Sequence, residues 1–136
     1  MTTGFELNEK LPTDLKKVTP FVEQVFRKIL TLTRTKEEIF KIKLALEEAL
    51  TNAMRHGNAL NPDRHVKVQI KADRKQIILD VHDEGKGFDF QSLPDPTERD
   101  NAAKPSGRGV FLMRSIMDTV EFYDNGSGVK MIKKFS

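Results

Sequence analysis

Residues 46–58 read LEEALTNAMRHGN and form part of the helix on which the fold is expected to depend. Glu48, Asn52 and His56 follow one another at intervals of four residues, so an α-helix places them in one row. The row borders an apolar stripe of the same helix, formed by Ile39, Ile42, Leu46, Ala49, Leu50 and Ala53. The pattern predicts a helix that packs one face in the core and presents polar groups to a ligand along the edge of that face.

The composition is that of one folded domain. With 136 residues, 38% hydrophobic and 32% charged, we expect a single domain with one core over residues 1–136. No apolar run approaches the ~20 residues of a membrane span, and the N-terminus lacks the pattern of a secretion signal. The absence of cysteine excludes disulfides and thiolate chemistry, and together these features favour a cytoplasmic protein.

The charge is mildly basic and well mixed. There are 23 Lys and Arg against 20 Asp and Glu, a formal net charge of +3. No dense basic stripe with interleaved aromatic residues occurs, so a solvated surface is favoured over direct nucleic-acid binding. An acidic protein partner remains compatible with this surface.

Hydrophobic periodicity predicts an α+β chain. Three helices are expected. The first covers about 13–32, the second begins at a capping box of Thr35 and Glu38 and ends at Gly57 and Asn58, and the third covers 107–118. Strands are expected at 5–9, 66–72, 76–82, 119–123 and 129–135, with a break at 11–13 and a polar loop at 91–107. Because tight hairpins join neighbouring strands, we predict a two-layer sandwich whose mixed, mostly antiparallel sheet is covered by helices on one face.

The helix row carries groups with distinct chemistry. The Glu48 carboxylate is suited to orienting or deprotonating a hydroxyl, and the Asn52 carbonyl is a hard oxygen ligand suited to Mg²⁺. A lone Glu-x-x-x-Asn also fits an ordinary surface row. His56 has no second His or Cys at ligand spacing, so we reject a zinc site and expect a packing or capping role for it.

Two glycine-containing stretches follow. In DEGKGF, Asp83 ends a strand and is placed to accept a hydrogen bond from an amino group such as that of adenine, while Gly85 and Gly87 allow close approach to a flat ring. An ordinary strand-to-loop turn is the alternative.

In SGRGVFLM, glycines precede a helix whose free N–H groups suit phosphate oxygens, and Arg108 adds charge. A common turn is again the alternative. The stretch is neither a Walker P-loop, since no Gly-Lys-Ser/Thr follows, nor a Rossmann fingerprint.

Together these stretches resemble the motifs of the GHKL ATPases, which include gyrase, histidine kinases, mismatch-repair ATPases and heat-shock chaperones. Glu48-x-x-x-Asn52 is similar to the N box of that family, Asp83-x-Gly85-x-Gly87 to its first glycine box, and Gly107-x-Gly109 to its second. Over essentially the whole chain, EEALTNAMRHGN, DEGKGFDF and PSGRGVFLMRSIMD resemble the anti-sigma factor serine/threonine kinases of bacterial partner-switching systems.

The resemblance implies a GHKL (Bergerat-type) fold that binds ATP and Mg²⁺. Glu48 would be the catalytic base and Asn52 the Mg²⁺ ligand, while Asp83 would bind the adenine amino group. The remaining implied positions are Gly85 and Gly87 beside the ring, a lid at 91–106, and phosphate-binding residues Gly107, Arg108, Gly109 and Val110. The family often has threonines in the final hairpin, one of which supports the adenine-binding aspartate; here Ser127 is the residue placed to substitute.

The implied function is a kinase that phosphorylates a serine or threonine of an antagonist protein and sequesters a sigma factor. Such a protein would act without contacting nucleic acid or membrane, and dimerisation is implied by the resemblance alone. A nucleotide-gated binding protein without kinase activity, or one with a non-sigma target, is the alternative, and the intact Glu48 favours the kinase. A histidine kinase fragment is disfavoured, because no upstream helical hairpin carries a phosphoacceptor histidine. A topoisomerase or repair ATPase is disfavoured because it would need a second domain.

Overall fold

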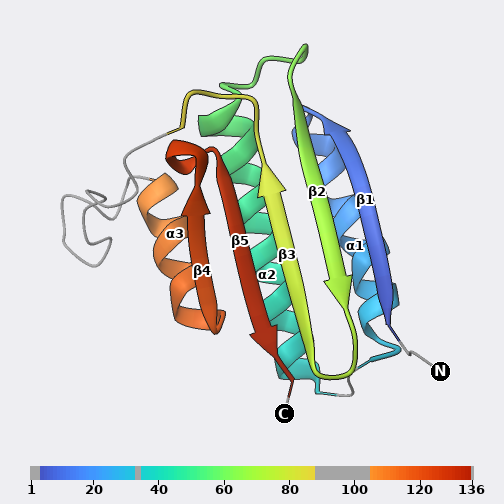
Figure 1. Ribbon diagram of the computed structural model, residues 1–136. Coiled ribbons are helices and arrows are strands. Elements are labelled where there is room, and N and C mark those ends of the chain that lie inside the picture. Colours follow the sequence, from blue (N-terminus) through green and yellow to red (C-terminus); the bar gives the residue numbers. More distant parts are fainter. Residues whose placement is uncertain (1–3, 33–34, 88–104, 136) are drawn as a thin grey trace.

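The computed structural model describes residues 4–32, 35–87 and 105–135. In this part of the chain a five-stranded sheet forms one layer and three α-helices cover one of its faces (Figure 1). The strands are β1 (Phe5–Pro12), β2 (His65–Ala72), β3 (Gln76–His82), β4 (Thr119–Tyr123) and β5 (Gly128–Lys134), and the helices are α1 (Val18–Ile29), α2 (Lys36–Asn52) and α3 (Pro105–Ile116). The predicted two-layer α+β sandwich is confirmed.

The sheet has the order β1-β2-β3-β5-β4. All four pairings among these described strands are antiparallel, so the prediction of a mixed sheet is wrong in this respect. The reason is that β1, which has no hairpin partner next to it in the chain, pairs antiparallel with β2, although α1 and α2 lie between these strands in the sequence. The strand β3 lies at the centre, and its C-terminal end points to the same end of the molecule as the end of α2 (Figure 1).

Two predicted boundaries near the N-terminus are wrong. The strand β1 continues through Leu11 and Pro12, which pair with Val66 and His65, so there is no break at 11–13. Proline is tolerated there because β1 is an edge strand. The helix predicted over 13–32 starts later, with a 3₁₀ turn at Leu15–Lys17 capped by the side chain of Asp14, and α1 ends at Ile29.

The end of α2 differs from a regular helix. After Asn52 the chain makes a π-helical turn, η2 (Ala53–Gly57), in which the Asn58 N–H donates to the Ala53 carbonyl at 2.7 Å. His56 lies within this π turn, beyond the end of α2 that carries Glu48 and Asn52. His56 is exposed, so of the two roles predicted for it packing is wrong, and capping stays a prediction.

The core lies between the helices and the sheet. All six residues of the predicted α2 stripe are buried, with 5% or less of each exposed. The facing strand β3 alternates, and Ile77, Leu79 and Val81 point into the core with at most 1% exposed. No helix in the described residues is long and apolar enough to cross a membrane.

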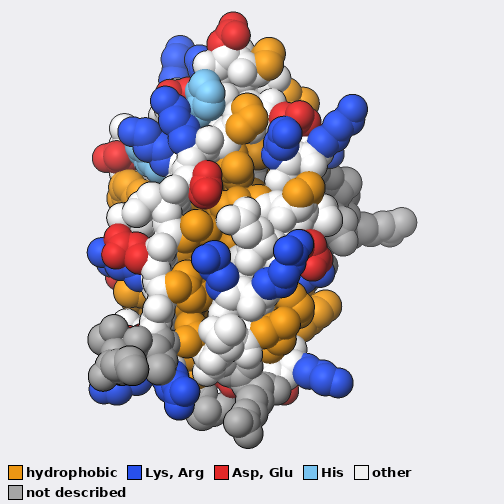
Figure 2. Space-filling view, turned by 90° about the vertical axis from the view of Figure 1, so that its right-hand side faces the viewer, with side chains coloured by type: hydrophobic (Ala, Val, Ile, Leu, Met, Phe, Trp, Pro, Cys, Tyr) orange, Lys and Arg blue, Asp and Glu red, His pale blue; other side chains and the backbone are white. Residues whose placement is uncertain are grey.

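Charged side chains of both signs share the surface. Figure 2 shows the edge formed by β1 and α1, where Lys, Arg, Asp and Glu side chains surround a line of hydrophobic side chains. Ion pairs among the described residues include Lys43 with Glu23 at 2.7 Å and Lys71 with Glu6 at 4.0 Å. Such pairs, which are at least partly exposed, contribute little to stability, so folding depends on the apolar core.

The two neighbouring isoleucines of β3 test this assignment of the core. We expect Ile77→Ala to lower the free energy of unfolding by about 2–5 kcal/mol, because Ile77 is fully buried against the helices. Ile78→Ala removes the same atoms from the half-buried, opposite face of the strand and should cost less than half as much. Urea unfolding of both variants measures the difference, and equal losses would contradict the predicted burial pattern.

Candidate functional site

The helices α2 and α3 meet at a glycine. A methyl group added to Gly109 would lie 2.8 Å from Asn52 Nδ2 and 2.8 Å from Glu48 Oε2. These distances are too short for a real Cβ, so the absence of a side chain at Gly109 leaves room for both polar groups. The structure thus brings together the predicted base, the predicted Mg²⁺ ligand and one predicted phosphate-binding residue.

The start of α3 differs from the prediction. The helix begins at Pro105, so Gly107, Arg108 and Gly109 lie within its first turns and not ahead of it. Proline suits the first position of a helix, where the missing N–H would have had no partner inside the helix. The N–H groups that follow in this first turn also lack intrahelical partners and remain suited to an anion. Val110 is 2% exposed, so its side chain belongs to the core and only its backbone can serve a ligand.

The predicted lid at 91–106 falls mostly on residues 91–104, which lie outside the described residues. Its last two positions, 105 and 106, form the beginning of α3.

Asp83 is packed against the end of η2. Its side chain is buried, and a methyl group on Gly57 would lie 2.1 Å from Asp83 Oδ2. A methyl group on Gly85 would lie 1.9 Å from the Gly57 carbonyl oxygen. Both positions therefore require glycine, because backbone and carboxylate occupy the space of a side chain.

The Asp83 carboxylate is held from one side. The Gly85 N–H donates to Asp83 Oδ1 at 2.8 Å, and none of the described residues donates to Oδ2. Burial raises the pKa of Asp83, while the Gly85 hydrogen bond and the nearby His82 and Arg64 oppose the rise. A half-satisfied, buried carboxylate of this kind is suited to accepting a hydrogen bond from an amino group of a ligand.

The final hairpin supports Asp83 through its backbone. The Asp83 N–H donates to the Ser127 carbonyl at 2.9 Å. The Ser127 hydroxyl donates to the Asp124 carbonyl at 2.8 Å and lies 3.3 Å from His82 Nε2. Among the described residues it makes no hydrogen bond to the Asp83 carboxylate, so Ser127 does not replace the family threonine through its side chain.

Gly87 is constrained by the same hairpin. Its φ is +86°, and a methyl group there would lie 2.0 Å from the carbonyl oxygen of Asn125. Asn125 belongs to the turn η3 (Asp124–Gly126) between β4 and β5. The glycines at 85 and 87 were expected to make room for a ring; the structure shows that each also makes room for a backbone carbonyl of the protein.

Two residues of this region were not predicted. Gly57 and Asn58 were interpreted only as the end of a helix, whereas Gly57 supports Asp83 and Asn58 is completely buried with its side chain bonded to Glu84. The His-Gly-Asn stretch is typical of an ordinary helix end. Nothing in it indicates a contact with residues 26 positions away in the sequence.

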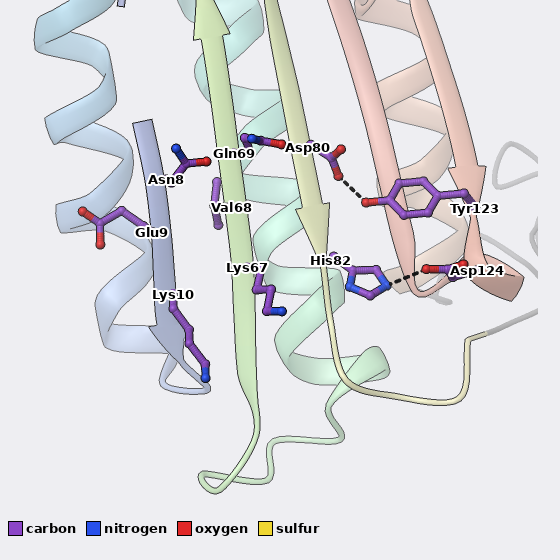
Figure 3. Close-up of a pocket in the computed structure, with 10 residues that line it drawn as sticks. All are labelled: Asn8, Glu9, Lys10, Lys67, Val68, Gln69, Asp80, His82, Tyr123 and Asp124. Atoms are coloured by element: carbon purple, nitrogen blue, oxygen red, sulfur yellow. Dashed lines mark hydrogen bonds and ion pairs between the residues drawn. The ribbon is translucent and has the colours of Figure 1, made fainter. Parts of the chain in front are cut away.

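A hollow of about 540 Å³ lies elsewhere, on the sheet face opposite the helices (Figure 3). The Tyr123 ring lies over Gly128 and stacks on His82 with centroids 5.5 Å apart. Its hydroxyl donates to Asp80, and His82 Nε2 lies 3.1 Å from the Asp124 carboxylate. These polar groups pair with one another, and none of the predicted site residues lines the hollow. The candidate site is therefore the end of the molecule where α2, α3 and Asp83 meet.

Most of the chain matches a known protein family. A family model described as the histidine kinase-like ATPase domain matches residues 9–133. This chain belongs to that family.

Its curated relatives are consistent with the assignment. An anti-sigma F factor of Clostridium perfringens (strain SM101) is 33% identical over 111 residues, which cover 78% of each chain. The anti-sigma F factor of Clostridium novyi is 35% identical over 112 residues, which cover 78% of each chain. That of Bacillus cytotoxicus is 34% identical over 102 residues, which cover 73% of this chain and 69% of the relative. The resemblance inferred from the sequence motifs is confirmed.

A histidine kinase-like ATPase domain implies ATP binding, and the donor set here fits a nucleotide-bound Mg²⁺. No cluster of three or more His, Cys, Asp or Glu placed to hold a metal occurs in the described residues. Asn52 is half-buried, its carboxamide lies against Gly109 together with the Glu48 carboxylate, and its oxygen would be one ligand for such an ion. Mg²⁺ bound through one protein ligand, phosphate oxygens and waters needs no more than this.

Gly109→Ala tests the contact of α2 and α3. Alanine favours a helix over glycine by about 1 kcal/mol, so we expect unchanged or higher stability in urea unfolding. The added methyl group must displace the Glu48 carboxylate and the Asn52 amide, so Mg-ADP affinity in calorimetry should fall about tenfold. Ser115→Ala, on the exposed face of α3, is the control and should change neither quantity. Unaltered Mg-ADP affinity in Gly109→Ala would show that the contact is not part of the site.

Asp83→Asn separates stability from binding. Since the pKa of Asp83 is raised by folding, the stability that its protonated form contributes is lost as pH rises through the folded pKa. The stability of the variant relative to wild type should therefore rise as the pH increases above about 4, the pKa of an aspartate in the unfolded chain. Its ADP affinity should fall tenfold or more, since a hydrogen bond to a charged group is lost.

The exposed Asp63→Asn is the control for the pH series, followed by unfolding at each pH. If Asp83→Asn lost stability at pH 7 but bound ADP normally, the carboxylate would be structural.

Proposed function

We propose that this protein binds Mg-ATP between α2 and α3 and acts as a serine/threonine kinase in a partner switch. Glu48 and Asn52 converge on Gly109 of α3, and this convergence is the main support for the proposal. The adenine would lie at Asp83, at the end of β3, and the phosphates at the first turn of α3.

Each residue has a part in the transfer. Glu48 accepts the proton of the serine or threonine hydroxyl. The hydroxyl oxygen forms a bond to the γ-phosphorus of ATP, and the bond between the γ-phosphorus and the bridging oxygen breaks, so that ADP leaves. Asn52 would hold Mg²⁺, which supplies neutralisation of the phosphate charge. The N–H groups in the first turn of α3 orient the phosphates, because the positive end of a helix favours negative charge.

The proposed partners are a sigma factor and a small antagonist protein that carries the acceptor serine or threonine. The names of the curated relatives, anti-sigma F factors, support a sigma factor as target. A homodimer is part of the proposal, whereas direct contact with nucleic acid is not. Binding of nucleotide to the folded state should stabilise the protein against heat, and well above the dissociation constant the gain should grow with the logarithm of the ligand concentration.

Glu48→Gln tests the kinase step. The variant keeps the shape of the side chain and should bind Mg-ATP like wild type, but transfer to the antagonist should be slower by about 10²–10⁴-fold because the base is lost. Glu47→Gln alters the neighbouring carboxylate of the same helix and is the matched control. The antagonist is obtained by affinity capture from source lysate with ATP or ADP, and transfer is followed with labelled ATP.

Transfer by Glu48→Gln at the rate of wild type would refute the base assignment. Capture that depends on nucleotide, with no transfer by wild type, would instead favour a nucleotide-gated binding protein. Capture of a partner other than a sigma factor or antagonist would indicate a different target.

A further inference from the structure

Asn58 is a buried polar residue at the junction of three segments. It follows the π turn η2 and has 0% of its surface exposed. Its Oδ1 accepts from the Glu84 N–H at 2.8 Å. Its Nδ2 donates to Thr13 Oγ1 at 2.9 Å and to the His65 carbonyl at 3.1 Å.

The hydrogen-bond capacity of this side chain is matched to its neighbours. A backbone N–H faces Oδ1 and a backbone carbonyl faces Nδ2, so the orientation of the carboxamide is fixed by groups that cannot exchange roles. Both hydrogens of Nδ2 are used. An aspartate lacks these hydrogens and a leucine lacks every polar atom, so only asparagine satisfies this site at this size.

The bond from Glu84 reaches directly into the candidate adenine site. Glu84 stands between Asp83 and Gly85, the two residues that pack on Gly57. Its carboxylate also accepts from the His65 N–H at 2.6 Å, so the turn is tied both to β2 and to the end of α2. Asn58 is the tie on the helix side.

We infer that Asn58 is a positioning residue for adenine recognition, which holds the Asp83–Glu84–Gly85 turn so that the Asp83 carboxylate faces the base. The inference rests on the proposed nucleotide binding at Asp83. Asn58 does not touch the nucleotide in this account; it acts through the Glu84 N–H. Loss of this bond lets the turn shift away from Gly57. The Asp83 carboxylate then no longer faces the adenine amino group, and the preference for adenine is reduced.

The test compares two variants that break different ends of the same network. Asn58→Ala removes the acceptor of the Glu84 N–H. Thr13→Val removes a hydroxyl that accepts from Asn58 and donates to the Arg64 carbonyl at 2.6 Å, but leaves the Glu84 bond in place. Both should lower the urea midpoint. The deciding quantity is the ratio of ADP to GDP affinity in calorimetry, because partial unfolding lowers both affinities equally and leaves their ratio unchanged.

Wild type is expected to prefer ADP, and Asn58→Ala should reduce that preference about tenfold, whereas Thr13→Val should keep it. Should Asn58→Ala not fold, Asn58→Ser serves instead, since its hydroxyl is too short to reach the Glu84 N–H. In the Asn58 variant, hydrogen exchange of the Glu84 and Gly85 amides should become faster than its lower overall stability explains. In Thr13→Val it should not.

The inference would be overturned if Asn58→Ala kept the wild-type ratio of ADP to GDP affinity, or if Thr13→Val reduced that ratio as much as Asn58→Ala. Wild-type protein that binds neither nucleotide would overturn the proposed function itself, which is a distinguishable result.

Discussion

The contact between Gly57 and Asp83 joins the two layers of the molecule at the site. The end of α2 and the end of β3 approach so closely that a methyl group at Gly57 would lie 2.1 Å from the Asp83 carboxylate. The chain accommodates this approach with a π turn before Gly57 and with a second glycine, Gly85, against the Gly57 carbonyl. The position of the Asp83 carboxylate therefore depends on the packing of helix on sheet and not on a flexible loop.

This arrangement lowers the stability of the folded protein. Burial disfavours the ionised form of Asp83 and raises its pKa, and only the Gly85 N–H among the described residues bonds to its carboxylate. A carboxylate kept in this way costs free energy that the apolar core must offset. The same reasoning applies to Gly109, where the helix gives up propensity to leave space for Glu48 and Asn52. Strained or costly positions that cluster at one end of a fold are typical of a binding site.

Much of the fold could be predicted because its signals are local. The period-two pattern gave β3 and β4 with their observed bounds, and the 3.6-residue period gave the buried stripe of α2. The wrong predictions concern long-range contacts: the continuation of β1 to Pro12 depends on its pairing with β2. Likewise, the chain pattern shows Glu48, Asn52 and Asp83 as chemically distinctive, but the roles of Gly57 and Asn58 appear only once distant segments meet. The sequence pattern places the start of α3 too late, because Pro105 is equally typical of a loop and of a first helical position.

The most direct test is to locate the nucleotide on the protein. In ¹⁵N-labelled protein titrated with Mg-ADP, the backbone amides of Gly57, Asp83, Gly85 and Gly109 should show the largest shift changes. Those of Lys67 and Gln69, beside the hollow on the opposite face of the sheet, should change little. Changes confined to Lys67, Gln69 and their neighbours, or no saturable change at millimolar Mg-ADP, would contradict the account.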